Sequence, residues 1–124
     1  MAIPLISLVI GLLLWACSAF RHYAYQSTAF DLGIYDQVAW LISRGLEAKS
    51  TLLDLHHIGN HGAYLFYFAG FLYWMLPSVN WLLATQAFSL SFTALPLIKI
   101  WKQKSLPLRF IVVVPLLWFL QPQV

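Results

Sequence analysis

The chain has 124 residues, of which 61% are hydrophobic and 9% are charged, and its formal net charge is +3. A soluble domain would carry about 25% charged residues, so this composition excludes an ordinary soluble protein and indicates an integral membrane protein. In such a protein the seven Lys and Arg residues report on topology and on lipid headgroups, and nucleic acid is not an expected partner.

The first apolar run, residues 2–20, contains no charged side chain. About 20 apolar residues cross a bilayer, so this run predicts a first transmembrane helix. A cleaved signal peptide, or a lipoprotein signal suggested by Leu14 to Cys17, stays open as an alternative. No basic residue precedes the run in this sequence, which disfavours both alternatives.

A second uncharged run extends from residue 62 to residue 98. As one helix it would be about 55 Å long, which is too long for a single span. Pro77, followed by Ser78 and Asn80, favours a turn inside this run. The pattern therefore predicts a helical hairpin with arms at 63–76 and 81–98.

A last apolar stretch, 106–120, predicts a fourth helix, either complete or truncated. The expected fold is an all-α integral membrane protein, a single membrane domain over residues 1–124, with three to four transmembrane helices. The expected location is a bacterial inner, or thylakoid-type, membrane, crossed several times. Membrane lipids are the first expected partners.

All four acidic residues and all four histidines fall in the polar segment 21–61. Within it, residues 32–44 place Ile34 and Val38 at helical spacing, which predicts a short amphipathic juxtamembrane helix lying at the membrane surface. Asp31 is expected as its N-cap, a common role for Asp. The alternative is functional: a carboxylate at the membrane surface can meet a lipid-linked substrate or a metal ion.

A second polar cluster contains Asp54, His57 and His61. Two histidines four residues apart suit a metal ion if they lie on a helix, with Asp54 as a third ligand. Gly59 and Asn60 favour a turn instead, which would remove that geometry. The histidines could then act as hydrogen-bonding groups, or bind phosphate when they are protonated.

Several strings together resemble a known family. The string 30–37, followed by Trp40, by the triplet 59–61, by the aromatic run 72–77 and by Gln86, is similar to the N-terminal region of an uncharacterised bacterial and archaeal family of predicted membrane proteins. That family looks related to the GT-C glycosyltransferases, polytopic enzymes that take a sugar from a polyprenyl-phosphate donor. The resemblance extends from about residue 21 to residue 98.

The resemblance implies an extracytoplasmic first loop that presents acidic residues to an active site, and Asp31 and Asp36 stand at the matching positions. A divalent metal ion is an expected cofactor if the protein is catalytic. Asn60 stands where the family often has Asp, which weakens a metal role for that segment. The complete set of candidates is as follows: Asp31 and Asp36 for catalysis, Arg21, His57 and His61 for substrate or phosphate, and Asp31, Asp54 and His57 for a metal ion.

GT-C enzymes need more helices and usually a soluble domain. The expected function is therefore the N-terminal part, or a shortened relative, of a GT-C-like glycosyltransferase that is not catalytic on its own. The alternative is a non-catalytic small integral membrane subunit of a larger complex, with other membrane subunits as partners. With four spans, the positive-inside rule places the loop 21–61 in the cytoplasm, whereas the resemblance places it outside.

Overall fold

The computed structural model describes residues 2–27, 29–61 and 63–104, together with Pro107, Arg109 and Val113. The helix expected at 106–120 falls, apart from those three residues, outside this description. The chain is mostly helical. Its elements are α1 (Ala2–Tyr23), α2 (Ala29–Ser43), β1 (Lys49–Ser50), β2 (Leu55–His56), α3 (His57–His61), α4 (Phe66–Met75), α5 (Asn80–Phe92) and α6 (Ala94–Lys104).

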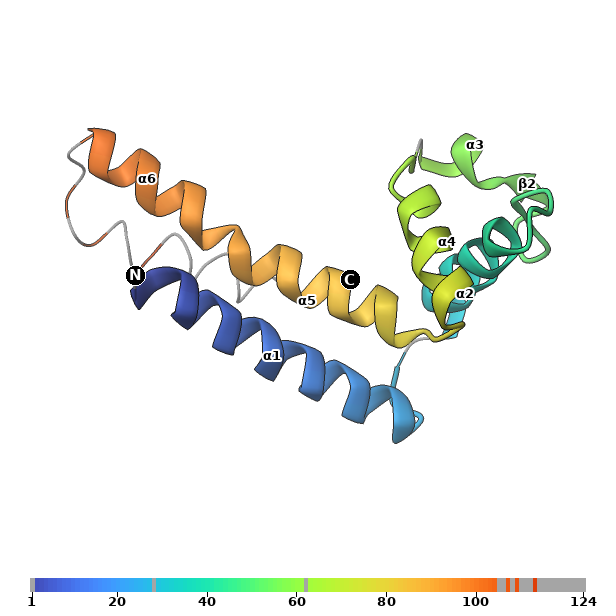
Figure 1. Cartoon of the computed structure of the whole chain (residues 1–124), viewed down its shortest axis with the longest axis horizontal. Helices are drawn as coiled ribbons and strands as arrows, with labels where there is room; N and C mark the ends of the chain where they lie inside the picture. Colours follow the sequence, from blue (N-terminus) through green and yellow to red (C-terminus); the bar gives the residue numbers. More distant parts are fainter. Residues whose placement is uncertain are drawn as a thin grey trace.

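The longest structure is an antiparallel helical pair, in which α1 runs in one direction and α5 and α6 return along it (Figure 1). The segments Pro4–Tyr23 and Asn80–Trp101 are both long and apolar enough to cross a membrane. At 1.5 Å per residue each reaches about 30 Å, the thickness of the hydrocarbon core. Within the described residues these two segments are the candidate spans, fewer than the three to four expected.

Small residues hold α1 against α5. Ser7 of α1 and Ala87 and Ser91 of α5 are all buried. A Cβ atom at Gly11 would lie 2.5 Å from Phe88 Cδ1 and 2.7 Å from Ser91 Oγ, which is inside van der Waals contact. Glycine at this position therefore lets the two helices approach closely, which is how helices associate where lipid surrounds them.

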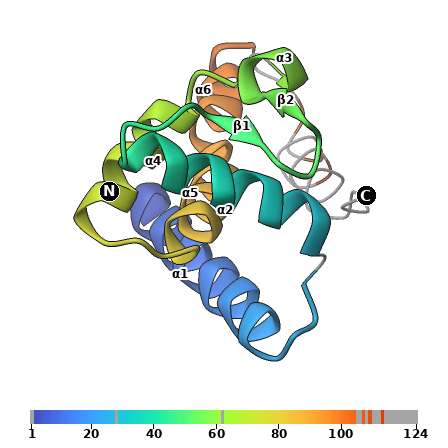
Figure 2. The same ribbon diagram turned by 90° about the vertical axis from the view of Figure 1, so that its right-hand side faces the viewer.

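The segment between α1 and α5 folds into a second unit at one end of the pair, where α2 crosses in front of α1 and α5 (Figure 2). Its core is the contact of α2 with α4, formed by Ala39, Ala69 and Tyr73. The rings of Tyr35 and Phe66 stack across this contact with centroids 4.8 Å apart. This unit holds all four acidic residues of the chain near one end of the two candidate spans.

A two-stranded antiparallel hairpin, which the sequence did not predict, completes this unit. Lys49 pairs with His56 and Ser50 with Leu55. The turn between the strands ends at Asp54, whose φ of +53° lies in the left-handed region. Asp tolerates this region better than most residues. The Asp54 carboxylate also forms an ion pair with Lys49 Nζ at 2.6 Å.

The helical hairpin expected between 63–76 and 81–98 does not form. The helix α4 packs on α2, and α5 packs on α1. The chain turns away after α4, because Leu76 is extended and Pro77 follows it. With ten residues, α4 is about 15 Å long and too short to cross a bilayer.

Candidate functional site

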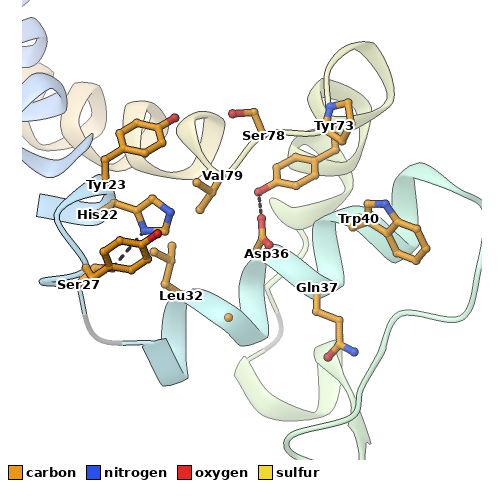
Figure 3. A pocket seen from close by; sticks show the side chains of 13 residues that line it. His22, Tyr23, Ser27, Leu32, Asp36, Gln37, Trp40, Tyr73, Ser78 and Val79 are labelled. Atoms are coloured by element: carbon orange, nitrogen blue, oxygen red, sulfur yellow. Dashed lines mark hydrogen bonds between the residues drawn. The ribbon is translucent and has the colours of Figure 1, made fainter. Parts of the chain in front are cut away.

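An open cavity of about 880 Å³ lies where the end of α1, one face of α2 and the end of α4 meet (Figure 3). Residues of α2 that line it recur at helical spacing, so that they form one face of the helix. The lining residues are His22, Tyr23, Tyr25 and Ser27 after or at the end of α1, Leu32, Gly33, Asp36, Gln37 and Trp40 of α2, Tyr73 of α4, and Pro77, Ser78 and Val79 before α5.

The central feature of the cavity is the contact between Asp36 and Tyr73. The Tyr73 hydroxyl donates a hydrogen bond of 2.5 Å to Asp36 Oδ1 (Figure 3), a length typical of a hydroxyl bonded to a carboxylate. Burial, and then this bond, raise the pKa of Tyr73 far above its ordinary value, so the phenol stays protonated as a donor. Among the described residues, Asp36 Oδ2 has no partner and can accept a hydrogen bond from a ligand.

Further hydrogen bonds fix the walls of the cavity. Gln37 Nε2 donates to Thr51 Oγ1 at 2.9 Å, and the Thr51 N–H donates to Gln37 Oε1 at 3.1 Å, so the β-hairpin turn is tied to α2. Asn80 Nδ2 donates to the Tyr23 hydroxyl at 2.7 Å, which joins the end of α1 to the start of α5. The cavity is thus built on helix ends that are held together by side chains.

The charge of the lining restricts what the cavity can bind. Asp36 is its one acidic residue, and the thirteen lining residues include no Lys or Arg. A phosphate group would meet the Asp36 carboxylate with no Lys or Arg in the lining. The guanidinium of Arg44 lies against the Trp40 ring at 5.9 Å but is not part of the lining, so the balance of charge in the lining itself disfavours an anion. Aromatic rings such as Trp40, beside Asp36 and Gln37, suit a neutral ligand that carries hydroxyl groups, because rings offer apolar contact and the polar groups fix orientation.

The structure separates Asp31 from this cavity. The helix α2 begins at Ala29 rather than at residue 32, so Asp31 lies in its first turn, and the expectation that Asp31 is the N-cap is wrong. A carboxylate in a first turn is favourable next to the positive end of the helix dipole. Asp31 is exposed and does not line the cavity, and the described part of the chain contains no ion pair between it and Arg21 or Arg44.

The histidine cluster is also apart from the cavity. Gly59 and Asn60 lie in a short helix, α3, contrary to the expected turn, and the His57 N–H at its start donates to the Ala48 carbonyl at 3.0 Å. The side chain of His57 is 5% exposed, and its ring lies 5.4 Å from that of Tyr67. Burial lowers the pKa of His57, with a further contribution from His56.

A neutral, buried imidazole argues against phosphate binding at His57. Neither of its ring nitrogens has a hydrogen-bond partner in the part of the chain that the structure describes. Asp54, the third expected ligand, is exposed, and its carboxylate forms an ion pair with Lys49. Residues 2–27, 29–61 and 63–104 contain no group of three His, Cys, Asp or Glu side chains placed to hold a metal ion, and the side chain of His61 is outside the description.

The structure therefore brings one expected residue, Asp36, to the cavity, and adds others that the sequence analysis did not select. Arg21 lies beside the lining residues His22 and Tyr23, and its exposed guanidinium donates to the Gln26 carbonyl at 3.4 Å. The helical spacing of Asp36 and Trp40 could have identified the α2 face. Tyr73 is 37 residues from Asp36, and no local pattern links them.

These features describe a mostly helical chain with two apolar helices long enough to cross a membrane and an open cavity, carrying one carboxylate, at one end of the pair. Residues 21–124 match a family described as predicted membrane protein, DUF2079, and the chain belongs to this family. No curated protein and no solved structure matches the chain. The family membership agrees with the membrane assignment made from composition and from the apolar helices.

Proposed function

We propose that the chain is the N-terminal part, or a shortened relative, of a GT-C-like membrane glycosyltransferase with a polyprenyl-phosphate sugar donor, and that the cavity holds the acceptor. The observation that carries this proposal is the Asp36 carboxylate, which lies in the cavity wall with one oxygen held by Tyr73. A carboxylate placed in this way can accept a hydrogen bond from an acceptor hydroxyl and orient or deprotonate it. The resemblance at 30–37 supplies the reaction class.

The donor would bind elsewhere, because the cavity lining offers no Lys or Arg side chain to a phosphate. Arg21, exposed at the end of α1, is the candidate for the donor phosphate, and Asp31, exposed on α2, is the candidate for a divalent cation. Additional helices would supply the remaining groups, so this chain is not catalytic on its own. In this arrangement Asp36, which contacts the acceptor, is separate from Arg21 and Asp31, which neutralise the charge of the donor phosphate.

The proposed topology has three spans, formed by α1, by α5 with α6, and by the stretch 106–120. Since α1 and α5 are antiparallel (Figure 1), the loop 21–61 lies at one end of the pair and Lys99 and Lys104 at the other. Lys99, Lys102, Lys104 and Arg109 follow the second span, whereas the loop carries Arg21, Arg44 and Lys49, so the end opposite the loop has one more basic residue. The positive-inside rule then places the basic end in the cytoplasm and the cavity outside.

The conflict found in the sequence came from counting 63–76 as a span. Removing that span moves the loop 21–61 to the opposite side from Lys99 and Lys104, so the charge count and the family resemblance agree. The test is the reaction of the Glu47→Cys variant with a maleimide. The variant is made in a Cys17→Ser background, because Cys17 is the one cysteine of the chain. We expect an impermeant maleimide to label it from outside intact cells. Labelling only after permeabilisation would refute the orientation.

A second candidate function is a non-catalytic small subunit of a larger membrane complex. The apolar side chains exposed on α1, including Leu5, Ile6 and Leu13, are compatible with it, because either lipid or the helices of a partner would cover them. Co-purification in nanodiscs followed by mass spectrometry distinguishes the candidates. Bound polyprenyl phosphate supports the glycosyltransferase, whereas stoichiometric partner proteins without such a lipid support the subunit.

The catalytic role is tested by paired substitutions in the complete protein as the cell makes it. Transfer of a radiolabelled sugar to the lipid fraction of membranes is measured for Asp36→Asn and Asp31→Asn, with the abundance of the folded protein measured in parallel. We expect Asp36→Asn to abolish transfer at unchanged abundance and at every donor and cation concentration, and Asp31→Asn to lower transfer in a way that added divalent cation or donor restores. Full activity of Asp36→Asn would refute the proposed role of the cavity.

A further inference from the structure

The helix α4 has two apolar faces, and the structure covers one of them. Ala69, Gly70 and Tyr73 are buried against α2. The opposite side, which we call the outer face of α4, recurs at helical spacing and is exposed. It consists of Tyr67, Phe68, Phe71, Trp74 and Met75, and the exposed Tyr64 in the turn before the helix continues it.

Exposure of such an apolar surface to water is unfavourable. Trp74 is 70% exposed and Met75 is 61% exposed, and no charged residue occurs between residues 62 and 98. A helix that is apolar on all sides is normally covered on all sides. Contiguous apolar patches of this kind on proteins mark contact with another protein or with a membrane. The outer face therefore requires an occupant.

The position of α4 identifies the occupant. A short connection, residues 76–79, joins α4 to Asn80, the first residue of the candidate span formed by α5 and α6. Asn80 is also hydrogen-bonded to Tyr23, at the end of the other candidate span. The end of α4 thus lies close to the level where both spans reach the membrane surface (Figure 1). Trp and Tyr side chains, which recur on the outer face, prefer this level.

We propose that the outer face of α4 is seated in the lipid bilayer, at the boundary between headgroups and acyl chains. In this arrangement α4 contacts the membrane without crossing it, and it continues the lipid-facing surface of α1 and α5. The proposal does not depend on the glycosyltransferase assignment. It explains why a segment with the composition of a span is only ten residues long and still carries large apolar side chains on its free side.

Nitroxide labels at single cysteines test this proposal in the full chain, reconstituted in phosphatidylcholine vesicles on a Cys17→Ser background. The labelled cysteines are introduced one at a time as Phe71→Cys and Phe68→Cys on the outer face, Leu13→Cys on the exposed side of α1, and Glu47→Cys in the polar loop. Power saturation measures collisions with oxygen, which concentrates in lipid, and with a water-soluble nickel chelate. Leu13 is the lipid reference and Glu47 is the water reference.

We expect the labels at positions 71 and 68 to favour oxygen over the nickel chelate, as the Leu13 label does, and the Glu47 label to show the reverse. A preference for nickel at positions 71 and 68, equal to that at Glu47, would place the outer face in water. Low collision rates with both reagents would mean that protein covers it. Either result overturns the proposal. Two independent outer-face sites guard against a local disturbance by one label.

Discussion

Replacing Gly70 by alanine tests the contact of α2 with α4, on which the cavity depends. A Cβ atom at this position would overlap Ile42 Cγ2 and would lie 2.8 Å from Ile42 Cβ. The β-branched side chain of Ile42 is restricted to few rotamers in a helix, so it cannot simply rotate away. The two helices must separate instead. Overpacking of this kind typically costs about 1–3 kcal/mol.

Alanine also favours the helical state over glycine by about 0.5–1 kcal/mol, which opposes the cost. The net expectation for Gly70→Ala is a loss of roughly 1–2 kcal/mol in the free energy of unfolding. Gly33→Ala is the matched control, because a Cβ atom there meets Leu52 Cδ1 at 3.9 Å, an ordinary contact. It should stabilise the protein by about 0.5–1 kcal/mol.

The assay is unfolding of the protein in dodecylmaltoside micelles by titration with sodium dodecyl sulfate, followed by tryptophan fluorescence. A difference of 1.4 kcal/mol is tenfold in the folded to unfolded ratio, so the two variants should separate clearly. Gly70→Ala should also disturb the hydrogen bond between Tyr73 and Asp36, since Tyr73 lies one turn further along α4. Equal stability of Gly70→Ala and Gly33→Ala would refute the close packing of α2 against α4.

Three further substitutions address other contacts by the same titration. Tyr73→Phe removes the hydroxyl that donates to Asp36, and we expect a loss of about 1.5–3 kcal/mol; an unchanged midpoint would contradict the pair. The pKa of His57 is lowered in the fold, so the unfolded state takes up the proton first as the pH drops below about 6.5, and the free energy of unfolding should fall there. His57→Phe should flatten this pH dependence. An unaltered slope in that variant would contradict the prediction. Gly11→Leu should weaken the contact of α1 with α5, whereas Leu13→Ala, on the exposed side of α1, should change the midpoint little.

The long apolar helices could be predicted from the sequence, because hydropathy and length are local properties. The run 2–20 corresponds to α1, and the run 81–98 lies within α5 and α6. The partners of the helices could not be predicted in the same way. Both α2 and α5 present apolar side chains, so hydropathy does not distinguish a pairing of α4 with α5 from a pairing with α2. The choice depends on shape, such as the fit of Gly70 against Ile42.

The candidate site was predictable in part for a related reason. The sequence predicted an acidic residue at the start of the helix in the loop 21–61. Because the predicted start was residue 32, the expected residue was Asp31. The observed start at Ala29 leaves Asp31 in solvent, and the face that carries Asp36 lines the cavity. The β-hairpin was missed because two-residue strands carry no periodic signal. Its contact with Gln37 depends on a turn that the sequence does not mark.

One helix links the two proposals. The buried face of α4 supplies Tyr73, which holds Asp36, while its outer face carries Phe71 and Trp74. The two faces are separated by no more than the diameter of a helix, about 10–12 Å with side chains. If lipid fixes the depth of the outer face, it also fixes the depth of the Asp36 carboxylate at the membrane surface. A ligand that reaches Asp36 would then present its hydroxyl groups at the interface while its apolar part stays in the bilayer, which is the geometry of a lipid-linked acceptor.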